Sequence, residues 1–250
     1  VVLTGGATVS RDLPLEGREL NGVHLAMEYL PQQNRSCEGD SIDARVEISA
    51  AGKHVVILGG GDTGDDCLGT THRQGAASVT SLENMPQPPA QRGEDNPWPE
   101  WPRIYRTASA HEEGGERLYS VSTKRFVGNS EGQVTELELI EVEMQMVDGR
   151  PNFVEKPDSV RRIPCDLGLL ALGFTGPETD GVIAELGLEV TERGTLQRDD
   201  LWMTSREGVF TAGDMQHGQS LIVWAIAEGR SAACAVDVYL TGSSNLPAPV

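Results

Sequence analysis

Basic side chains are scarce in this 250-residue sequence: 20 Lys and Arg stand against 38 Asp and Glu, a formal net charge of −18. A protein that binds the phosphate backbone needs a basic surface, so this balance argues against nucleic acid as a partner. No run of about 18 uninterrupted apolar residues is present either, which argues against a membrane-spanning helix. We therefore expect a soluble protein with neither nucleic acid nor a membrane as a partner.

Cysteine is also rare, and the four cysteines lie at least thirty residues apart at Cys37, Cys67, Cys165 and Cys234. Without a C-x-x-C pair, local spacing cannot build a zinc site or an iron–sulfur cluster. Cys67 and Cys165 fall on segments that we expect to be buried, where packing is their expected role. This cysteine usage favours a reducing compartment and a cytoplasmic location.

The chain lacks an initial Met and the charged start and cleavage site of a signal peptide. It opens instead with a strand-like apolar run and a glycine turn, Val1–Ala7. We interpret this as a start in the middle of a fold, so that the sequence is a fragment. The 29 glycines and the apolar share of 38% are nevertheless typical of a globular chain with a packed core.

The strongest local pattern begins at residue 54. His54–Leu58 is a short β-branched run, typical of a strand buried on both faces of a parallel sheet. A glycine turn follows, then a helix over Asp62–Gln74 with Gly75 as its left-handed cap, then a second strand over Ser78–Leu82. Strand, glycine turn, helix and strand within about 30 residues are the βαβ unit of a dinucleotide-binding domain.

Glycine and proline divide the rest of the chain into further elements. We expect a short helix at 23–30 stopped by Pro31, an ordered proline-rich loop at 85–102, antiparallel strands between 118 and 147 with a β-bulge near 139/140, a buried strand at 166–173, a short helix at 178–186, a strand at 208–214 and a final helix at 220–240. The antiparallel strands would lie on the parallel sheet as a crossover ribbon.

The pattern Gly59-x-Gly61-x-x-Gly64 directly follows the first strand of that unit. It provides a tight turn, close approach of the backbone to a pyrophosphate and close helix packing, while N–H groups at Asp62 and Thr63 start the helix and face the anion. We therefore name these five residues as candidate nicotinamide-dinucleotide ligands. The alternative is a glycine-rich turn in another kind of α/β protein.

Glu83 closes the second strand about 20 residues beyond the fingerprint, where a carboxylate can accept hydrogen bonds from the adenosine ribose. Its charge would repel a 2′-phosphate, and the residues that follow supply no nearby arginine, so NADH is favoured over NADPH. Two alternatives remain open: Glu83 is an exposed strand-end residue, or Arg92 or Arg103 folds back onto a phosphate.

A second candidate site follows the late strand that ends in Gly-Asp. A strand-terminal aspartate can hold a sugar-alcohol hydroxyl, and N–H groups at the start of the final helix can meet a flavin. A common turn explains Gly-Asp equally well. The candidate residues, with the glycine that ends the 166–173 strand, are Gly173, Gly213, Asp214, Gln219, Ser220 and Leu221.

Six segments carry motifs of one protein family. They are residues 59–64 (Gly-Gly-Gly-Asp-Thr-Gly), 85–89 (Met-Pro-Gln-Pro-Pro), 96–102 (Asn-Pro-Trp-Pro-Glu-Trp-Pro), 111–113 (His-Glu-Glu), 173–178 (Gly-Phe-Thr-Gly-Pro-Glu) and 208–215 (Gly-Val-Phe-Thr-Ala-Gly-Asp-Met). Together they resemble the small (beta) subunit of glutamate synthase over nearly the whole chain. The Asn-Pro-Trp-Pro block is far more specific than a glycine fingerprint alone.

This resemblance implies an α/β fold in which a Rossmann-like nicotinamide-binding domain is inserted in a partial FAD-binding domain, with the antiparallel β crossover ribbon. The expected divisions are residues 1–50 for the end of the first FAD-domain segment plus a connection, 51–175 for the NAD(P)-binding domain and 176–250 for the returning FAD-domain segment. No catalytic acid or base and no metal ligand is expected in this chain, because the flavin performs the redox chemistry in such an enzyme.

The resemblance also implies a function. NAD(P)H would reduce FAD, and electrons would pass through iron–sulfur clusters to the large (alpha) subunit, where 2-oxoglutarate and glutamine-derived ammonia become glutamate. The family's cluster cysteines and FAD fingerprint lie in an N-terminal region without a counterpart here, so we expect this chain alone to hold no cluster, to bind FAD poorly and to be inactive. The alternatives are a dinucleotide-binding module without chemistry and a related flavin oxidoreductase with another electron acceptor.

Overall fold

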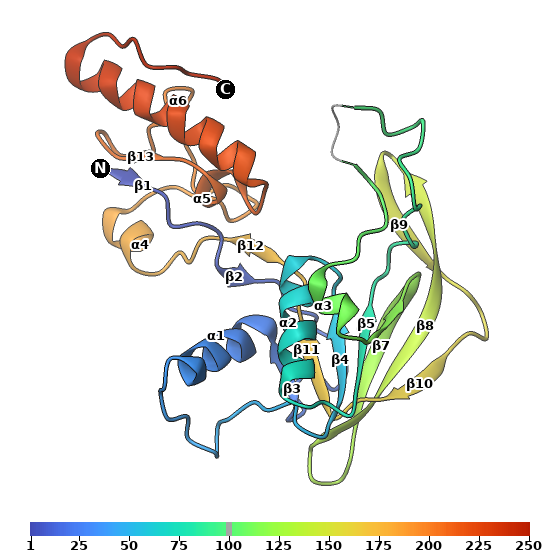
Figure 1. Cartoon of the computed structure of the whole chain (residues 1–250). Coiled ribbons are helices and arrows are strands. Elements are labelled where there is room, and N and C mark those ends of the chain that lie inside the picture. The colour runs from blue at the N-terminus through green and yellow to red at the C-terminus, as the bar shows by residue number, and fades with distance from the viewer. Residues whose placement is uncertain (99–101) are drawn as a thin grey trace. The chain divides into compact units, whose positions relative to one another are not determined.

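The computed structural model describes residues 1–98 and 102–250. The chain forms two compact units (Figure 1). The smaller unit combines Val1–Arg11 with Gly173–Val250, and the larger unit is Asp12–Leu172. One unit is therefore inserted in the sequence of the other, the topology that the resemblance implies.

The first boundary differs from the expected one. In the structure the inserted unit begins at residue 12, whereas the sequence predicts its start at residue 51. Strand β3 (Val23–Leu25) pairs in parallel with β11 (Leu167–Leu170), and the fully buried Tyr29 of helix α1 (Ala26–Cys37) packs in the same core. Residues 12–50 thus complete the sheet and one face of the larger unit. The second boundary lies at 172/173, close to the expected 175/176.

A parallel five-stranded sheet of order β3-β11-β4-β5-β6 is the centre of the larger unit. Strand β4 (His54–Leu58) leads through helix α2 (Asp62–Arg73) to β5 (Ser78–Leu82), which confirms the predicted βαβ unit. Strand β6 (Glu116–Leu118) extends the sheet beyond β5, and the single-turn helix α3 (Ser109–Glu112) precedes it. The carboxyl ends of β4 and β5 meet at one edge, because the strands are parallel and in register.

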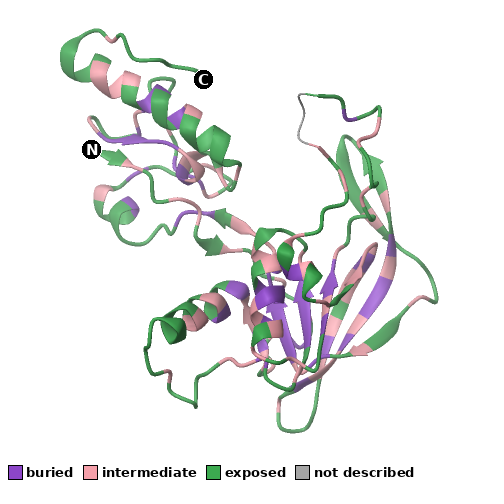
Figure 2. Ribbon diagram, in the orientation of Figure 1, coloured by how far each residue is buried: buried purple, intermediate pink, exposed green. Residues whose placement is uncertain are grey.

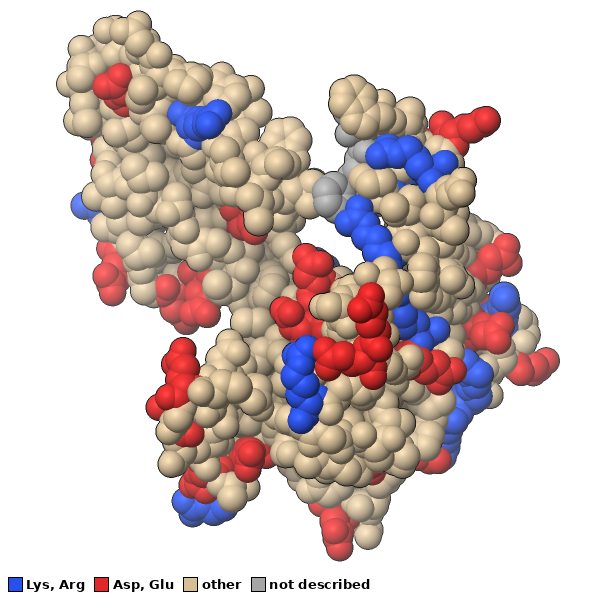
Figure 3. All heavy atoms as spheres, in the orientation of Figure 1, with Lys and Arg blue, Asp and Glu red and all other residues tan. Residues whose placement is uncertain are grey.

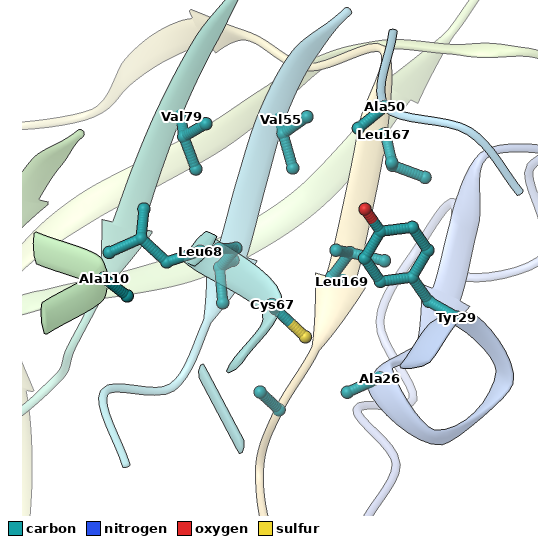
Figure 4. Close-up of a cluster of buried hydrophobic side chains, with 12 residues drawn as sticks. Ala26, Tyr29, Ala50, Val55, Cys67, Leu68, Val79, Ala110, Leu167 and Leu169 are labelled. Carbon is teal, nitrogen blue, oxygen red and sulfur yellow. The ribbon is translucent and has the colours of Figure 1, made fainter. Parts of the chain in front are cut away.

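The two faces of this sheet bury different partners. Val55 and Ile57 of β4 face helices α1 and α2, where they pack with Leu68 and other buried side chains (Figure 4). Val56 and Leu58, which alternate with them, face the antiparallel ribbon. The purple strands in Figure 2 show the resulting concentration of buried residues, which confirms a strand buried on both faces.

The antiparallel ribbon is built from β7 (Val121–Gly128), β8 (Val134–Val147), β9 (Arg150–Glu155) and β10 (Arg161–Pro164). The sequence predicts a β-bulge near 139/140 in the 134–147 run, but at this place the extra residue lies on the partner strand β7, and β8 has its own extra residue further back, at Thr135. Lys124 is the extra residue on β7, between the pairs Thr123–Leu139 and Arg125–Glu138. An extra residue bends the ladder locally, so two successive residues of β8, at 139 and 140, are both buried.

The helix predicted at residues 23–30 begins and ends later. Helix α1 covers Ala26–Cys37 and contains Pro31, which the sequence predicts as its stop. Beyond the proline, the Gln32 side chain exchanges two hydrogen bonds of 3.0 Å with the backbone of Ile48. These contacts hold the second half of the helix in place, although proline leaves one helical hydrogen bond unmade.

The loop predicted at residues 85–102 contains no helix or strand in its described part, residues 85–98 and 102. Pro99, Glu100 and Trp101 of the tryptophan–proline block lie outside the described residues.

The smaller unit has short strands and one long helix. Strand β1 (Val2–Leu3) pairs in parallel with β13 (Phe210–Thr211), and β2 (Val9–Ser10) pairs antiparallel with β12 (Phe174–Gly176). Helices α4 (Val182–Leu186), α5 (Asp214–His217) and α6 (Ile222–Thr241) complete it. The strand predicted at 208–214 has only two residues, because the glycines at both of its ends take positive φ. Among the described residues, no helix combines the length and apolarity needed to cross a membrane.

Candidate functional site

The turn after β4 is held in shape by its first glycine. Gly59 has φ +116°, a backbone conformation that side chains strongly disfavour, and its N–H donates to the Leu82 carbonyl at 3.0 Å. A Cβ on Gly59 would lie 2.2 Å from the Ala171 carbonyl oxygen. The chain can therefore make this turn between β4, β5 and β11 only with glycine.

The other fingerprint glycines have different roles. A Cβ on Gly64 would lie 2.3 Å from the Gly59 carbonyl oxygen, so this glycine lets α2 pack directly on the turn. Gly61, the cap residue before α2, has φ −91°, and a Cβ there would meet no atom within 4 Å. Neither conformation nor packing within the protein requires glycine at 61. Its missing side chain keeps open the approach to the first N–H groups of α2, those of Asp62 and Thr63, which a helix leaves without intrahelical partners.

Glu83 lies beside this turn, as the sequence predicts. It lines a hollow of about 180 Å³ together with Gly59, Gly60 and Asn84, at the carboxyl ends of β4 and β5. Its carboxyl group covers Gly60, where a Cβ would lie 2.1 Å from it. Burial raises the pKa of Glu83 above its usual range, while the charge of Arg117 acts in the opposite direction.

Arg117 is the basic residue that sequence analysis missed. Its Nη2 lies 3.8 Å from Glu83 Oε1, although the two residues are 34 positions apart on neighbouring strands. Arg92 and Arg103, the two arginines that the sequence offers as alternatives, instead bond within the proline-rich loop, to the Asn96 carbonyl and to Asp95. A basic residue four positions before the Val121–Gly128 strand gives no local signal, so only the β5–β6 pairing could have shown it.

Asp65 points toward helix α3. Its Oδ1 lies 3.4 Å from His111 Nε2, and the Ala108 N–H donates to His111 Nδ1 at 3.1 Å. Because Nδ1 accepts, the neutral ring carries its proton on Nε2 and presents it to Asp65. Burial lowers the pKa of His111 and raises that of Asp65. Figure 3 shows acidic side chains gathered over α2 and α3, where Asp62 and Asp66 are exposed.

The smaller unit has its own hollow, of about 290 Å³. Four of the predicted residues line it: Gly213, Asp214, Ser220 and Leu221. The Ser220 hydroxyl donates to Asp214 Oδ1 at 3.0 Å, which ties the start of α6 to the end of β13. Gly213 has φ +73°, and this conformation turns the chain sharply into α5.

Gln219 and Gly173 lie together, but they are not among the residues that line this hollow. The Gln219 Oε1 accepts the N–H of Phe174 at 2.9 Å, and a Cβ on Gly173 would lie 2.5 Å from the same oxygen. Their structural role is to connect the loop before α6 to β12. Trp224 is 44% exposed and stacks on His217, with ring centroids 6.0 Å apart, so it is not a core residue of the smaller unit.

Glu228 is the second residue that sequence analysis missed. It lies on α6 between two residues that line the hollow, Ala225 and Gly229, and is only 3% exposed. Its Oε2 accepts the N–H of Gly213 at 2.8 Å and the side-chain amide of Gln216 at 2.6 Å. Glu228 directly follows the apolar run Ile222–Ala227, and an acidic residue in this place is the signal that could have found it, because a buried carboxylate requires donors.

Within residues 1–98 and 102–250, no group of three or more His, Cys, Asp or Glu side chains is arranged to hold a metal ion. Two glycine-lined hollows lie at the carboxyl ends of strands, and the hollow of the smaller unit is also lined by the first residues of α5 and α6. Such crevices at the ends of parallel strands bind nucleotides.

The fold and these two turns define a class of α/β oxidoreductases that bind dinucleotides. The chain belongs to the pyridine nucleotide-disulphide oxidoreductase family, whose model matches residues 1–229.

Curated relatives show which kind of protein within this family the chain resembles. The chain is 58% identical, over its full length, to a glutamate synthase [NADPH] small chain of Mycobacterium tuberculosis, of which it covers 51%. It is 42% identical over 99% of its length to a glutamate synthase [NADH] of Saccharomyces cerevisiae, of which it covers 12%. The resemblance inferred from the motifs is confirmed. The chain spans about half the length of the small chain that it matches.

Solved structures confirm the fold class. Mycobacterium tuberculosis FprA in complex with NADPH matches with a TM-score of 0.70 at 15% identity, covering 96% of this chain and 63% of FprA. A thioredoxin reductase of T. acidophilum matches with a TM-score of 0.57 at 20% identity, covering 96% of this chain and 65% of that one. At these identities the likeness concerns the fold alone.

Proposed function

We propose that this chain is the electron-input part of a glutamate synthase small subunit, in which hydride passes from a nicotinamide dinucleotide to FAD. The larger unit would bind the dinucleotide at the Gly59–Gly64 turn, and the smaller unit would contribute the hollow at Gly213 and Asp214 to the flavin site. The observation that carries the proposal is Gly61, a glycine that the protein's own packing does not require. A pyrophosphate at the start of α2 explains it.

The flavin site is supported by Gly229, a second glycine that packing within the protein does not require. Gly229 lies inside α6, where glycine is destabilising by about 1 kcal/mol relative to alanine. A Cβ there would meet no atom within 4 Å, and Gly229 lines the 290 Å³ hollow. A side chain at 229 would narrow this space, so the residues present fit a group that lies against the helix.

The chain's own residues bind and orient in this proposal. The amides of Asp62 and Thr63 would hold the pyrophosphate, and Glu83 would accept hydrogen bonds from ribose hydroxyls. Asp214, tied to Ser220, would accept a hydroxyl of the flavin's sugar-alcohol chain. Bound FAD supplies the redox chemistry itself, so we assign no side chain as a general acid or base.

We propose NADH as the favoured dinucleotide, because the Glu83 carboxylate lies where a 2′-phosphate would be repelled. The matched proteins are named for both cofactors, NADPH in the small chain and NADH in the longer yeast protein. The choice therefore has to come from the residues around the ribose.

The remaining parts of the proposal rest on the resemblance to the glutamate synthase small subunit. The partner would be a glutamate synthase large subunit, reached through iron–sulfur clusters held outside this chain, and the location would be cytoplasmic. Glutamine and 2-oxoglutarate would be the substrates of the assembled enzyme.

The test is a calorimetric titration of the 250-residue chain, in which the heat of binding is measured separately for NADH, NADPH and FAD. The Gly61→Ala variant should bind either dinucleotide at least tenfold more weakly, because a methyl group occupies the approach to the pyrophosphate amides, while its melting temperature stays unchanged. Gly69→Ala is the control for glycine replacement in the same unit, because a Cβ there would meet only the end of the flexible Arg73 side chain. Wild-type chain that binds no dinucleotide, or Gly61→Ala that binds as well as wild type, would contradict the proposal.

A further inference from the structure

Glu83 and Arg117 form an oppositely charged pair at the edge of the dinucleotide hollow. Glu83 follows the last residue of β5, and Arg117 lies on β6, the next strand of the sheet. Their nearest atoms, Oε1 and Nη2, are 3.8 Å apart. The carboxylate that would contact the ribose thus has a guanidinium beside it, and any group attached to the ribose 2′-oxygen would meet both charges.

Arg117 is held in this place by its neighbours. Its guanidinium carbon lies 4.7 Å from the ring centroid of Tyr105 and 5.4 Å from that of Tyr119. Its Nη1 donates to the Arg106 carbonyl at 2.8 Å. The side chain is only 16% exposed. An arginine braced by two aromatic rings and a carbonyl keeps one orientation, so it loses little conformational entropy when it bonds an anion.

The charges around the pair favour this arrangement. Asp65 of α2 raises the pKa of Glu83, whereas Arg117 lowers it, and burial is the largest cause of its upward shift. His111, which lies beside Asp65, is neutral at pH 7 because burial lowers its pKa. Arg117, and after it the Tyr119 side chain, therefore lower the pKa of Glu83 against the effects of burial and of Asp65.

We propose that Arg117 is a specificity-determining residue that acts against Glu83 at the ribose 2′-position of the dinucleotide. Glu83 accepts the 2′-hydroxyl of NADH and repels the 2′-phosphate of NADPH. Arg117 attracts that phosphate and weakens the repulsion, so the wild-type chain discriminates only modestly between the two dinucleotides. This inference rests on the proposed function, since it concerns the same dinucleotide site.

The experiment measures dissociation constants of NADH and NADPH, at one low ionic strength, for the wild type, Glu83→Gln, Arg117→Met and the double variant. Glu83→Gln should lower the ratio Kd(NADPH)/Kd(NADH) by about tenfold or more, because Arg117 is then unopposed. Arg117→Met should raise the ratio by a similar factor, chiefly through weaker NADPH binding. The double variant should return the ratio toward the wild-type value.

Two further variants test whether the Kd ratio depends on a guanidinium at position 117 or on positive charge in general. Arg161→Met removes an exposed arginine of β10 in the same unit and should leave the ratio unchanged. Arg117→Lys keeps the charge, but an ammonium cannot stack between two tyrosine rings as a planar guanidinium does, so its ratio should lie between those of wild type and Arg117→Met. Melting temperatures of all variants identify any that fail to fold.

The outcomes distinguish this inference from the proposed function. If the wild type binds dinucleotides in a Gly61-dependent way and neither Glu83→Gln nor Arg117→Met moves the ratio, the specificity role of the pair is wrong while the proposed function stands. If the folded wild type binds neither dinucleotide, the proposed function fails and this inference fails with it.

Discussion

The Nδ1 atom of His217 lies 2.6 Å from Oε1 of Glu228, and this contact completes a buried carboxylate that accepts three donors from a single turn. Gly213, Gln216 and His217 all belong to residues 213–217, between β13 and the start of α6. One side chain of α6 therefore determines the shape of the turn that places Asp214 at the hollow. The turn has only four helical residues of its own, so it depends on this tertiary contact.

Replacing Glu228 should destabilise the smaller unit. Glu228→Ala leaves the Gly213 N–H and two side-chain donors without their partner, and breaking a buried charged network of this kind costs roughly 3–5 kcal/mol. Glu228→Gln should cost less, about 1–2 kcal/mol, because an amide oxygen can still accept two of the donors. Urea unfolding measures both. Glu192→Gln, an exposed change in the same unit, is the control, and a Glu228→Ala variant as stable as that control would refute the network's role.

Gly64→Ala should destabilise the larger unit. The new methyl group would lie 2.3 Å from the Gly59 carbonyl oxygen, a backbone atom, so α2 must shift away from the turn. Overpacking of this kind costs about 1–3 kcal/mol. Gly61→Ala is the matched control in the same turn, because its methyl group points into open space. Equal melting temperatures for the two variants would contradict the packing described here.

The four thiols should differ strongly in reactivity. Burial raises the pKa of Cys67 to about 12 and that of Cys165 to about 12, whereas Cys37 is exposed and Cys234 is partly exposed. At pH 8 a disulfide reagent should modify Cys37 at least a hundredfold faster than Cys67 or Cys165, because the thiolate is the reactive form. Urea should release the two buried thiols. Rapid modification of three or more thiols in the native chain would show that the core of the larger unit is open.

Glu83 should make stability depend on pH. Burial raises its pKa in the folded chain, so the folded state binds this proton more tightly than the unfolded state does. Its ionisation therefore lowers stability as pH rises above the ordinary value of 4.5. Glu83→Gln removes this cost, so the variant should exceed the wild type in urea midpoint at pH 8, with a smaller difference at pH 5. A variant less stable at pH 8 than the wild type would mean that the attraction to Arg117 outweighs burial.

The βαβ unit could be predicted because its information is local. His54–Leu58, the glycines that follow and the helix to Arg73 each carry their signal within a few residues, through β-branched packing, turn conformation and helix capping. The structure adds a distinction among these glycines: Gly59 takes a positive φ, Gly64 lets the helix pack on the turn, and Gly61 leaves open space beside the start of α2. Glu83 could be placed at the hollow for the same reason, since it ends the next strand.

Residues that act through distant partners could not be predicted in this way. Arg117 meets Glu83 only because β6 pairs with β5, and the bulge near 139/140 belongs to β7 because the strand partners decide which side carries the extra residue. Pro31 remains inside α1 because Gln32 bonds to Ile48, a contact across sixteen residues. The secondary-structure propensities of neighbouring residues do not contain information on such contacts. The free energy of these contacts exceeds the local preference for helix, strand or turn.

The amino-acid order by itself indicated the class of this protein: a strand, three glycines, a helix and a following acidic strand end are a pattern typical of a dinucleotide-binding domain, and its residues lie close together in the sequence. Only the tertiary structure decided that residues 12–50 belong to the inserted unit, that an arginine lies beside Glu83 and that Glu228 holds the turn at Asp214. The physical reason is that these features are made by side chains and strands brought together after the chain has folded, where burial and charge act across space.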